Sequence, residues 1–554
     1  MAVDYPSRER WAARRPLSRG LVIFLAVAAL VFALQLLARA YVTERGNYSD
    51  EAAHFMNGLL VRDYVASGMH VTPIRFAQDY YLSYPKIAPG MWPGLFLATL
   101  GLVFLPGWAP HPAALVFVGL VTALTACRLR AIVSPLPLAP WLVTVLFLVT
   151  PIQVALSTAV MIDGLVALFA LEATWWLARY FETTERRAAV VFGALTALAC
   201  LSKPNGMALC VAPLLLVAFT GRFDVLRRAD LFLSALIVLV AAAPAVAFSY
   251  YLDGKSDVFA VPGWWAALDR ARFYGRFLLR ELGPVCLILA ALGFAAGLRR
   301  ATRGPGSRRM VAPALGALVV GGFLFHMWNP HPTVEGRYLS LLIAPLLALA
   351  AFGVESVARL SEGRRTAVRW SLYAGLVAGF LAAHPLFVPR QPLGYRDAVA
   401  FLSSRGALAG NRVLIVSDEN GEGAFVAEVA ALTLSPRPTI LRATKVLAES
   451  DWDGHGTRLL FPSAAAVLEE LESLHVDHIV VDPAADSKAT PFWGQIATLV
   501  RTPHDRLERV YERPATADGV ARSISIYRLT RLPPGPPKKL RLRLTSSFGW
   551  TLER

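Results

Sequence analysis

The sequence predicts a multi-pass α-helical membrane protein with a C-terminal soluble α/β domain. Of its 554 residues, 55% are hydrophobic and only 17% are charged, and the mean hydropathy is +0.49. Soluble globular proteins do not have this composition. Apolar runs of roughly 17–22 residues recur along the chain, and each is long enough to cross a hydrocarbon core of about 30 Å as a helix. From Pro389 onward the pattern changes to alternating strands and helices.

The first predicted span, residues 20–40, is interpreted as a retained helix. Its apolar run is too long for a typical signal peptide, no small-residue cleavage site follows it, and further spans come after it. Basic residues before this run place the N-terminus in the cytoplasm. Residues 41–111 then form a large first outer loop. Its apolar stretch 91–105 is expected to lie in the membrane interface or to dip into the membrane.

Further apolar runs alternate with basic loops, and this alternation sets the direction of each crossing. We predict about 11–13 transmembrane helices, where the higher number applies if a pair of spans has been merged or missed. The transmembrane domain is therefore expected to comprise residues 1–388. The runs after the first outer loop are 112–127, 138–155, 161–180, 188–202, 205–220, 230–250, 283–298, 310–328, 338–358 and 370–387.

The formal net charge of +16 does not indicate a nucleic-acid partner. Much of the basic charge lies in short loops between spans, and the rest lies in the C-terminal third. One loop, 251–282, departs from the alternation because it is predicted outside and yet is basic. Its segment 264–274 is typical of an amphipathic interfacial helix whose arginines face anionic lipid headgroups. The alternative is a different topology at this loop.

Residues 389–554 are predicted to form the α/β domain on the outer, periplasmic side. The expected elements are strands at 413–416, 478–482, 507–512 and 523–528, and helices at 463–474 and 491–501. Strand–helix alternation raises the question of a nucleotide site. The segment 418–423 is acidic and would repel phosphate, so we do not predict nucleotide binding there.

Ionisable residues gather at the outer ends of the predicted spans. Asp50 and Glu51 follow the first span, and Asp163 lies at the outer end of a later one. Charges in such places are costly unless they are paired or face a wet cavity. Acids beside basic groups suit an anionic substrate and proton transfer. The other residues predicted on this side are Lys86, Lys203, His331, Glu335, Arg337 and Tyr338.

Each of these residues also has a structural interpretation. Ser49 could cap a helix that starts at Asp50, with both acids favoured by the helix dipole. The two lysines could extend to lipid headgroups. Asp163 could pair with a neighbouring helix, Arg337 could pair with Glu335, and His331 could be an ordinary loop residue. His54 could share a helix face with Glu51 for structural reasons. The functional hypothesis therefore rests on co-location.

Four short stretches carry a resemblance to a known family: 48–52 (YSDEA), 84–92 (YPKIAPGMW), 161–164 (MIDG) and 335–339 (EGRYL). With the predicted topology, they resemble polyprenyl-phosphate-sugar-dependent glycosyltransferases of GT-C architecture. These enzymes include the bacterial lipid A aminoarabinose transferases and the protein O-mannosyltransferases. The resemblance covers about residues 20–388 and implies a fold of the GT-C type.

The resemblance also implies an activity. It suggests inverting transfer of one sugar from an undecaprenyl-phosphate donor to an envelope acceptor, which could be a lipid, a glycan or a protein. Lipopolysaccharide modification is one such outcome. The reaction would occur on the periplasmic side of the bacterial inner membrane, among membrane lipids.

The implied site residues fall into three groups. Asp50, Glu51 and Asp163 would be catalytic. Lys86, Arg337 and Lys203 would bind the donor phosphate. The substrate cavity would be lined by Tyr81, Tyr84, His331, Glu335 and Tyr338. A divalent metal ion stays open as a cofactor, because Pro85 stands where aminoarabinose transferases have a glutamate that could be a ligand.

Two other functions fit the composition. One is a transporter or flippase of lipid-linked saccharides, and the other is a glycan ligase or polymerase with a pyrophosphate-linked donor. Transporters often show inverted repeats and broken helices near the midplane. This sequence shows no clear repeat, and its polar residues are predicted on one side of the membrane, which favours the glycosyltransferase.

Overall fold

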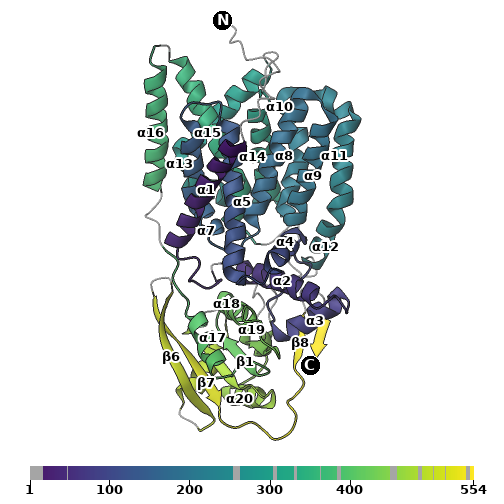
Figure 1. Cartoon of the computed structure of the whole chain (residues 1–554), viewed down its shortest axis with the longest axis vertical. Helices are drawn as coiled ribbons and strands as arrows, with labels where there is room; N and C mark the ends of the chain where they lie inside the picture. Colours follow the sequence, from purple (N-terminus) through teal and green to yellow (C-terminus); the bar gives the residue numbers. More distant parts are fainter. Residues whose placement is uncertain are drawn as a thin grey trace.

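The computed structural model shows a helical bundle, a layer of short helices and an α/β domain stacked along one axis (Figure 1). It describes residues 17–46, 48–253, 262–302, 308–329, 333–361, 363–383, 389–449, 458–483, 490–502, 505–517, 520–544 and 550–553. Within these ranges the chain forms a multi-pass bundle followed by strands and helices, as the composition predicts.

Each apolar run predicted to span the membrane coincides with a helix or with a bent pair of helices. The helices are α1 (Leu17–Leu37), α5 (Pro110–Val133), α6 (Ala139–Val149), α7 (Pro151–Ser157), α8 (Asp163–Thr183), α9 (Arg186–Ser202), α10 (Ala208–Thr220), α11 (Ala229–Ala241), α12 (Ala243–Asp253), α13 (Trp264–Ala301), α14 (Val311–Trp328), α15 (Ser340–Leu360) and α16 (Arg365–Ala383). Short 3-10 turns precede α10 (η2, Pro204–Met207) and α15 (η4, Gly336–Leu339).

Length and hydropathy identify some of these helices as spans on their own. Within the described residues, five helices are long and apolar enough to cross a membrane. The number rises to seven if the bent pairs α6–α7 and α11–α12, with bends of 67° and 46°, each count as one span. The predicted number of 11–13 spans stays a prediction.

Two glycines allow α13 and α15 to pack closely in the centre of the bundle. A Cβ atom on Gly353 of α15 would overlap the carbonyl oxygen of Leu289, and one on Gly293 of α13 would overlap that of Leu349. Small residues at a helix crossing let two backbones approach, which is a main source of packing energy between helices in a membrane.

We expect Gly353→Val to destabilise the bundle by about 1–3 kcal/mol, because the added carbons must push α13 and α15 apart. Thermal unfolding in detergent would measure the loss. Gly375→Val in α16 is the matched control, since no atom lies within 4 Å of its Cβ position. If the two variants were equally destabilised, the change in helix propensity from glycine to valine, and not the close approach of α13 and α15, would explain the loss of stability.

The first outer loop folds largely into helices: α2 (Ser49–Ala66), α3 (Pro73–Ser83) and α4 (Leu95–Phe104). With ten residues, α4 is too short to cross a membrane. It packs on α2, and its Phe96, Leu100 and Phe104 are at most 1% exposed. The apolar stretch 91–105 therefore contributes to a protein core in this layer.

The α/β domain is built on a mixed five-stranded sheet with the order β2–β1–β5–β7–β6. Strand β1 is parallel to β2 and β5, and β7 is antiparallel to β5 and β6. The strands are β1 (Arg412–Val416), β2 (Thr439–Arg442), β5 (His478–Val481), β6 (Leu507–Ala517) and β7 (Val520–Leu529). All four predicted strands are confirmed, whereas β2 is an additional strand.

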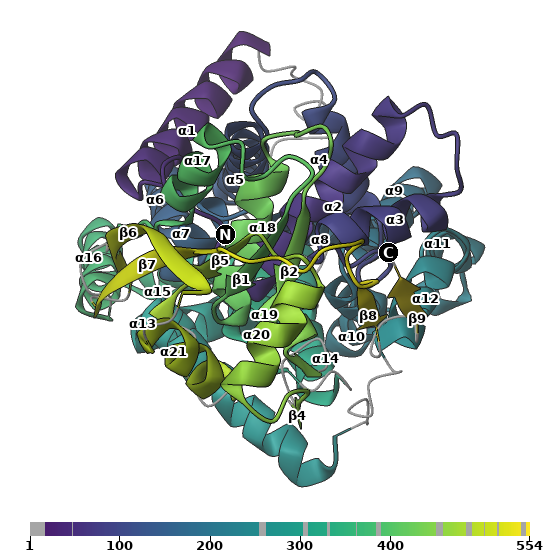
Figure 2. The same ribbon diagram turned by 90° about the horizontal axis from the view of Figure 1, so that it is seen from below.

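The helices of this domain are α17 (Tyr395–Ser404), α18 (Glu419–Ala430), α19 (Ala443–Val446), α20 (Ala464–Ser473) and α21 (Trp493–Arg501). Two small ribbons complete it, namely β3 (Ala448–Glu449) with β4 (Arg458–Leu459), and β8 (Arg541–Leu544) with β9 (Trp550–Glu553). Seen from below, the domain lies over α2, α3 and the end of the bundle (Figure 2). Its buried core is continuous with that of α2–α4.

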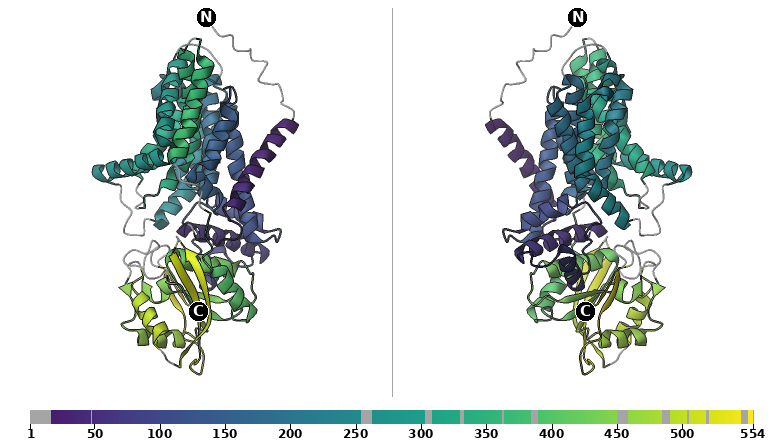
Figure 3. Two further views of the ribbon diagram at one scale, coloured as in Figure 1. Left: turned by 90° about the vertical axis from the view of Figure 1, so that its left-hand side faces the viewer. Right: turned by 90° about the vertical axis from the view of Figure 1, so that its right-hand side faces the viewer.

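The segment predicted as an interfacial helix is helical and forms the start of α13. A positive φ of 74° at Gly283, directly before Pro284, breaks α13 into two parts. The first part extends sideways from the bundle, at the level where the bundle meets the short helices (Figure 3). Trp264 and Trp265 are exposed on it, as expected of an aromatic anchor at a membrane surface.

Candidate active site

Asp50 and Arg337 form an ion pair between the first turn of α2 and the η4 turn that leads into α15. Arg337 Nη2 donates to Asp50 Oδ2 at 2.5 Å and to Glu335 Oε1 at 2.7 Å. The Arg337 side chain is 3% exposed and that of Asp50 is 15% exposed. The expected Arg337–Glu335 pair thus exists, and Asp50 joins it from a segment 287 residues away.

The start of α2 differs in one detail from the expected helix cap. Tyr48 is the N-cap residue, its backbone is extended, and no side chain caps the helix. The predicted capping role of Ser49 is therefore wrong, because Ser49 is already the first helical residue. Asp50 and Glu51 lie in the first turn, where the helix dipole favours carboxylates.

Asp163 and Lys203 form a second ion pair. Asp163 is the first residue of α8, and Lys203 lies between α9 and η2. Lys203 Nζ donates to Asp163 Oδ1 at 2.8 Å, and both side chains are almost fully buried. The second oxygen, Asp163 Oδ2, is buried and has no hydrogen-bond partner among the described residues. It is therefore available to accept a hydrogen bond from a bound molecule.

Tyr338 connects the two ion pairs. Lys203 Nζ lies 4.6 Å from the centre of the Tyr338 ring, and the Arg337 guanidinium lies 5.5 Å from it. The Tyr338 hydroxyl donates to Glu335 Oε1 at 3.4 Å. Five of the predicted residues other than Tyr338 thus meet in one network: Asp50, Asp163, Lys203, Glu335 and Arg337. We call this network the acid–base cluster.

The cluster holds Asp50 as an anion. Burial raises the pKa of Asp50, but the nearby Arg337 guanidinium, with smaller contributions from His54 and Lys203, outweighs burial and holds the pKa below its usual range. His54 lies one turn further along α2. Burial lowers the pKa of His54 to about 4, so its imidazole is neutral at pH 7. The structural interpretation of His54 fits its complete burial beside Trp92, at 4.5 Å between ring centres.

Glu51 points to different partners from its neighbour Asp50. It is fully buried, its Oε1 accepts from the Val160 backbone N–H at 3.2 Å, and its Oε2 lies 3.3 Å from Arg390 Nη2. Successive residues of a helix point about 100° apart, so the two carboxylates serve separate networks. These two bonds lead away from the acid–base cluster, and the catalytic role of Glu51 stays a prediction.

Lys86, Tyr81 and Tyr84 lie where the first outer loop meets the α/β domain. Lys86 is 3% exposed and packs against Gly423 of α18, whose Cβ position is 2.8 Å from Lys86 Cε. Burial, with a smaller contribution from the Arg442 guanidinium, lowers the pKa of Lys86 to about 8. The Asp50 carboxylate raises this pKa and so opposes part of the effect. Both tyrosines are buried in the apolar core that α3 shares with the α/β domain. Their role in a substrate cavity stays a prediction.

No protein-family model matches the chain, and no curated protein matches its sequence. ArnT from Cupriavidus metallidurans bound to undecaprenyl phosphate matches with a TM-score of 0.51 at 13% identity, over 92% of this chain and 98% of ArnT. The chain has the GT-C fold. ArnT in the apo state gives a TM-score of 0.51 at 12% identity over the same shares. The arabinofuranosyltransferase AftD from Mycobacteria gives 0.48 at 16% identity, over 95% of this chain and 40% of AftD.

In the GT-C fold of this chain, the acid–base cluster lies at the end of the bundle next to the short helices and the α/β domain. It is contributed by the starts of α2 and α8, the end of α9 and the turn before α15 (Figure 1). His331 falls outside the described residues. No group of three or more His, Cys, Asp or Glu in the described part of the chain could hold a metal ion.

An apolar cavity of about 640 Å³ lies within the GT-C bundle, between α9, α10, α11 and α12. Cys200 and Met207 line it, and these two residues flank the turn that carries Lys203. Other lining residues are Phe192, Leu214, Val238 and Tyr250. The cavity is therefore large and apolar enough to hold part of a hydrocarbon chain.

Two aromatic contacts of the cluster were not predicted from the sequence. The Tyr48 ring lies 5.2 Å from the Arg337 guanidinium, and the His326 ring stacks on Tyr338 at 5.9 Å. Tyr48 belongs to the quoted acidic motif, but nothing in that motif indicates a cation–π contact. His326 is a single histidine in the apolar run of α14, and such a residue is more often part of the core.

Proposed function

We propose that this protein is a membrane glycosyltransferase. It transfers one sugar, with inversion, from an undecaprenyl-phosphate donor to an envelope acceptor on the periplasmic side. The observation that carries the proposal is the acid–base cluster, in which Arg337 and Lys203 are buried between carboxylates at one end of an apolar bundle. Paired charges at such a depth favour a functional site.

The cations suit a lipid phosphate. Among the described residues, the hydrogen-bond partner of Arg337 Nη1 is the sulfur of Met161, at 4.0 Å, and sulfur is a weak acceptor that an oxyanion readily displaces. Lys203 and Lys86 add positive charge near Asp50. Fixed positive groups stabilise a leaving phosphate as its charge grows in the transition state. The apolar cavity, whose lining residues Cys200 and Met207 flank Lys203 in the sequence, suits the lipid chain, and undecaprenyl phosphate is the ligand of the ArnT structure.

The carboxylates suit the acceptor and the sugar. In the proposed step, an acceptor oxygen bonds to the anomeric carbon while the bond from that carbon to the phosphate oxygen breaks, and its electron pair leaves with the polyprenyl phosphate. A hydroxyl acceptor passes its proton to Asp50. When the donor phosphate draws Arg337 away, Asp50 becomes a stronger base. Asp163 Oδ2 accepts from a sugar hydroxyl.

The test begins with the sugar. Mass spectrometry of envelope lipids and glycans, with and without the protein, should show one sugar modification missing and its lipid-linked donor accumulating. The purified protein in nanodiscs should then release undecaprenyl phosphate from that donor. Movement of the intact donor across a liposome without release would indicate a flippase. Release of a pyrophosphate-linked lipid would indicate a ligase or polymerase.

The lowered pKa of Lys86 leads us to expect that kcat/KM for the donor depends on pH. With a pKa of about 8, its ammonium is present below that pH and is lost above it. If Lys86 binds the donor phosphate, kcat/KM for the donor should fall as the pH rises through about 8. Lys86→Arg should shift this fall upward, because a guanidinium stays charged. Lys538→Arg is the control, as Lys538 lies on the surface beside Glu470. Identical pH profiles for the parent and Lys86→Arg would remove Lys86 from the site.

A further inference from the structure

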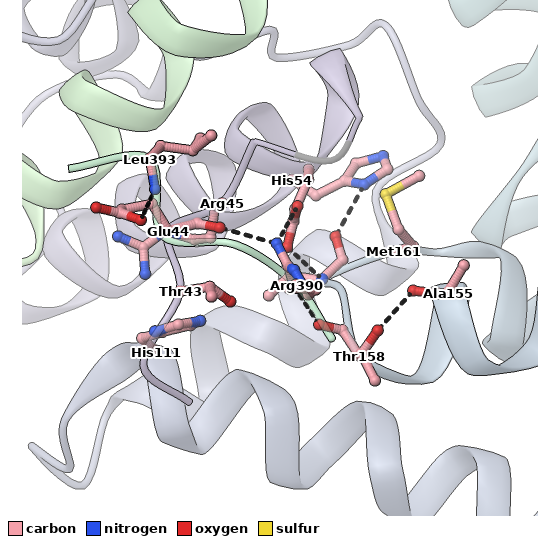
Figure 4. Close-up of polar contacts among 12 residues, drawn as sticks. Thr43, Glu44, Arg45, His54, His111, Ala155, Thr158, Met161, Arg390 and Leu393 are labelled. Carbon is pink, nitrogen blue, oxygen red and sulfur yellow. Dashed lines mark hydrogen bonds and ion pairs between the residues drawn. The ribbon is translucent and has the colours of Figure 1, made fainter. Parts of the chain in front are cut away.

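Arg390, where the chain enters the α/β domain, binds several segments of the membrane part at once. Its backbone N–H donates to the Ala38 carbonyl at 3.1 Å. Its guanidinium donates to the Thr158 carbonyl, to the Glu44 carbonyl at 2.8 Å and to Glu51 Oε2 at 3.3 Å. Figure 4 shows Arg390 between the Glu44 and Thr158 segments. The residue therefore joins the end of α1, the start of α2 and the turn before α8.

Glu51 extends this connection to the acid–base cluster. Its other oxygen accepts from the Val160 N–H at 3.2 Å, and the Val160 carbonyl lies 3.3 Å from His54 Nδ1. Val160 is thus bonded to α2 on both sides. Asp50 precedes Glu51 directly, and Asp163 follows Val160 by three residues. The hydrogen bonds from Arg390 to Glu51 and from Val160 to Glu51 therefore hold together the two segments that present Asp50 and Asp163.

We propose that Arg390 and Glu51 are positioning residues of the transfer site. They set the position of Asp50 relative to Asp163, which makes the entry to the α/β domain part of the catalytic scaffold. This inference rests on the proposed function. Arg390 is 8% exposed and Glu51 is not exposed, so loss of either side chain leaves a buried charge without its partner and forces a local rearrangement. A displacement of about 1 Å at such a site can lower turnover by about 10²-fold.

Other contacts attach the α/β domain without touching Val160, and they supply a matched control. Glu44 accepts from the N–H groups of Leu393 and Gly394 at the start of α17, at 2.7 and 2.9 Å. Arg45 pairs with Glu428 at 2.8 Å. Arg396 lies 3.3 Å from Glu428 and donates to the Tyr41 carbonyl. Loss of Arg396 should therefore loosen the same junction and leave the Glu51–Val160 connection intact.

The experiment compares Arg390→Ala, Arg390→Lys and Glu51→Gln with Arg396→Ala, each as the full chain in nanodiscs. The expected result is a fall in kcat of about 10²-fold for Arg390→Ala, with the donor KM changed less than threefold. Added guanidinium should restore part of this activity. Arg396→Ala should stay within about threefold of the parent. Hydrogen–deuterium exchange at residues 158–163 should increase in Arg390→Ala and Glu51→Gln, and not in Arg396→Ala.

Parent-like kcat in a folded Arg390→Ala variant would overturn the inference, and so would equal losses in Arg390→Ala and Arg396→Ala. If Arg390→Ala does not fold, Arg390→Lys and Glu51→Gln decide by the same criteria. If the parent protein transfers no sugar, the proposed function is contradicted, and not this inference. Hydrogen exchange in Arg390→Ala would then test separately whether Arg390 holds the two segments together. Unchanged exchange at residues 158–163 would overturn this structural role of Arg390.

Discussion

Asp50→Asn is expected to lower kcat for release of polyprenyl phosphate by about 10²–10⁴-fold, the range typical of a lost general base or acid. Asparagine keeps the size of the side chain but cannot take a proton or carry the charge that Arg337 binds at 2.5 Å. The donor KM should change little, because the cations that bind phosphate remain. Single-turnover kinetics with the donor found by mass spectrometry would measure both values.

Asp63→Asn is the matched control for this variant. Asp63 lies on the same helix, α2, and pairs with Arg62 at 2.7 Å, away from the acid–base cluster. It should keep kcat within about threefold of the parent. If Asp50→Asn released polyprenyl phosphate at the parent rate with a hydroxyl acceptor, Asp50 would not be the base. If the acceptor proved to be a phosphate, which is already an anion, a small effect would assign Asp50 to positioning.

Arg337→Lys has the second largest expected effect, a fall in kcat of about 10²–10³-fold. The guanidinium donates from Nη2 to Asp50 and to Glu335 and keeps Nη1 for a further oxyanion. A lysine offers one point charge and cannot hold three acceptors in a plane. Arg337→Ala should also unfold the protein more easily, by about 3–5 kcal/mol, because it leaves the two carboxylates without their cation.

Arg359→Lys provides the comparison. Arg359 lies in the last turn of α15, the helix that follows the η4 turn of Arg337, and it pairs with Glu355 at 3.2 Å while 40% exposed. Kinetics and thermal unfolding should be close to those of the parent. A parent-like kcat for Arg337→Lys would exclude the forked donor as a requirement for transfer, and the phosphate site would then have to rest on Lys203 and Lys86.

Part of the site was predictable from the sequence. Asp50, Asp163, Lys203 and Arg337 are rare ionisable residues next to apolar runs, and membrane burial makes such residues stand out. Their partners were harder to predict. Asp50 binds Arg337 across 287 positions of sequence, and Glu51, its neighbour, binds Val160 and Arg390 instead. Local periodicity cannot reveal these pairings, because they depend on how α2, α8 and α15 pack.

The same division applies to the fold. Helices α2, α3 and α4 form within a segment expected as a loop, and α18 forms at an acidic stretch. The acidic stretch has a structural use, since Glu422 binds Arg442 at 2.9 Å with both side chains buried. Helix α18 packs on α2, and residues of both helices are buried in one core, so no single window of sequence carries the signal.

Short segments of sequence were enough to predict that this chain crosses a membrane several times, that charged residues gather at one end of its spans, and that an α/β domain follows. These properties arise from the hydrophobicity and charge of short segments, each of which acts nearly independently of the others. The pairing of each carboxylate with its cation, and the position of Arg390 between the two acidic segments, follow from the packing of the helices and could not be predicted. Hydrogen bonds and ion pairs act over about 3 Å, so they depend on the packing of segments far apart in the chain.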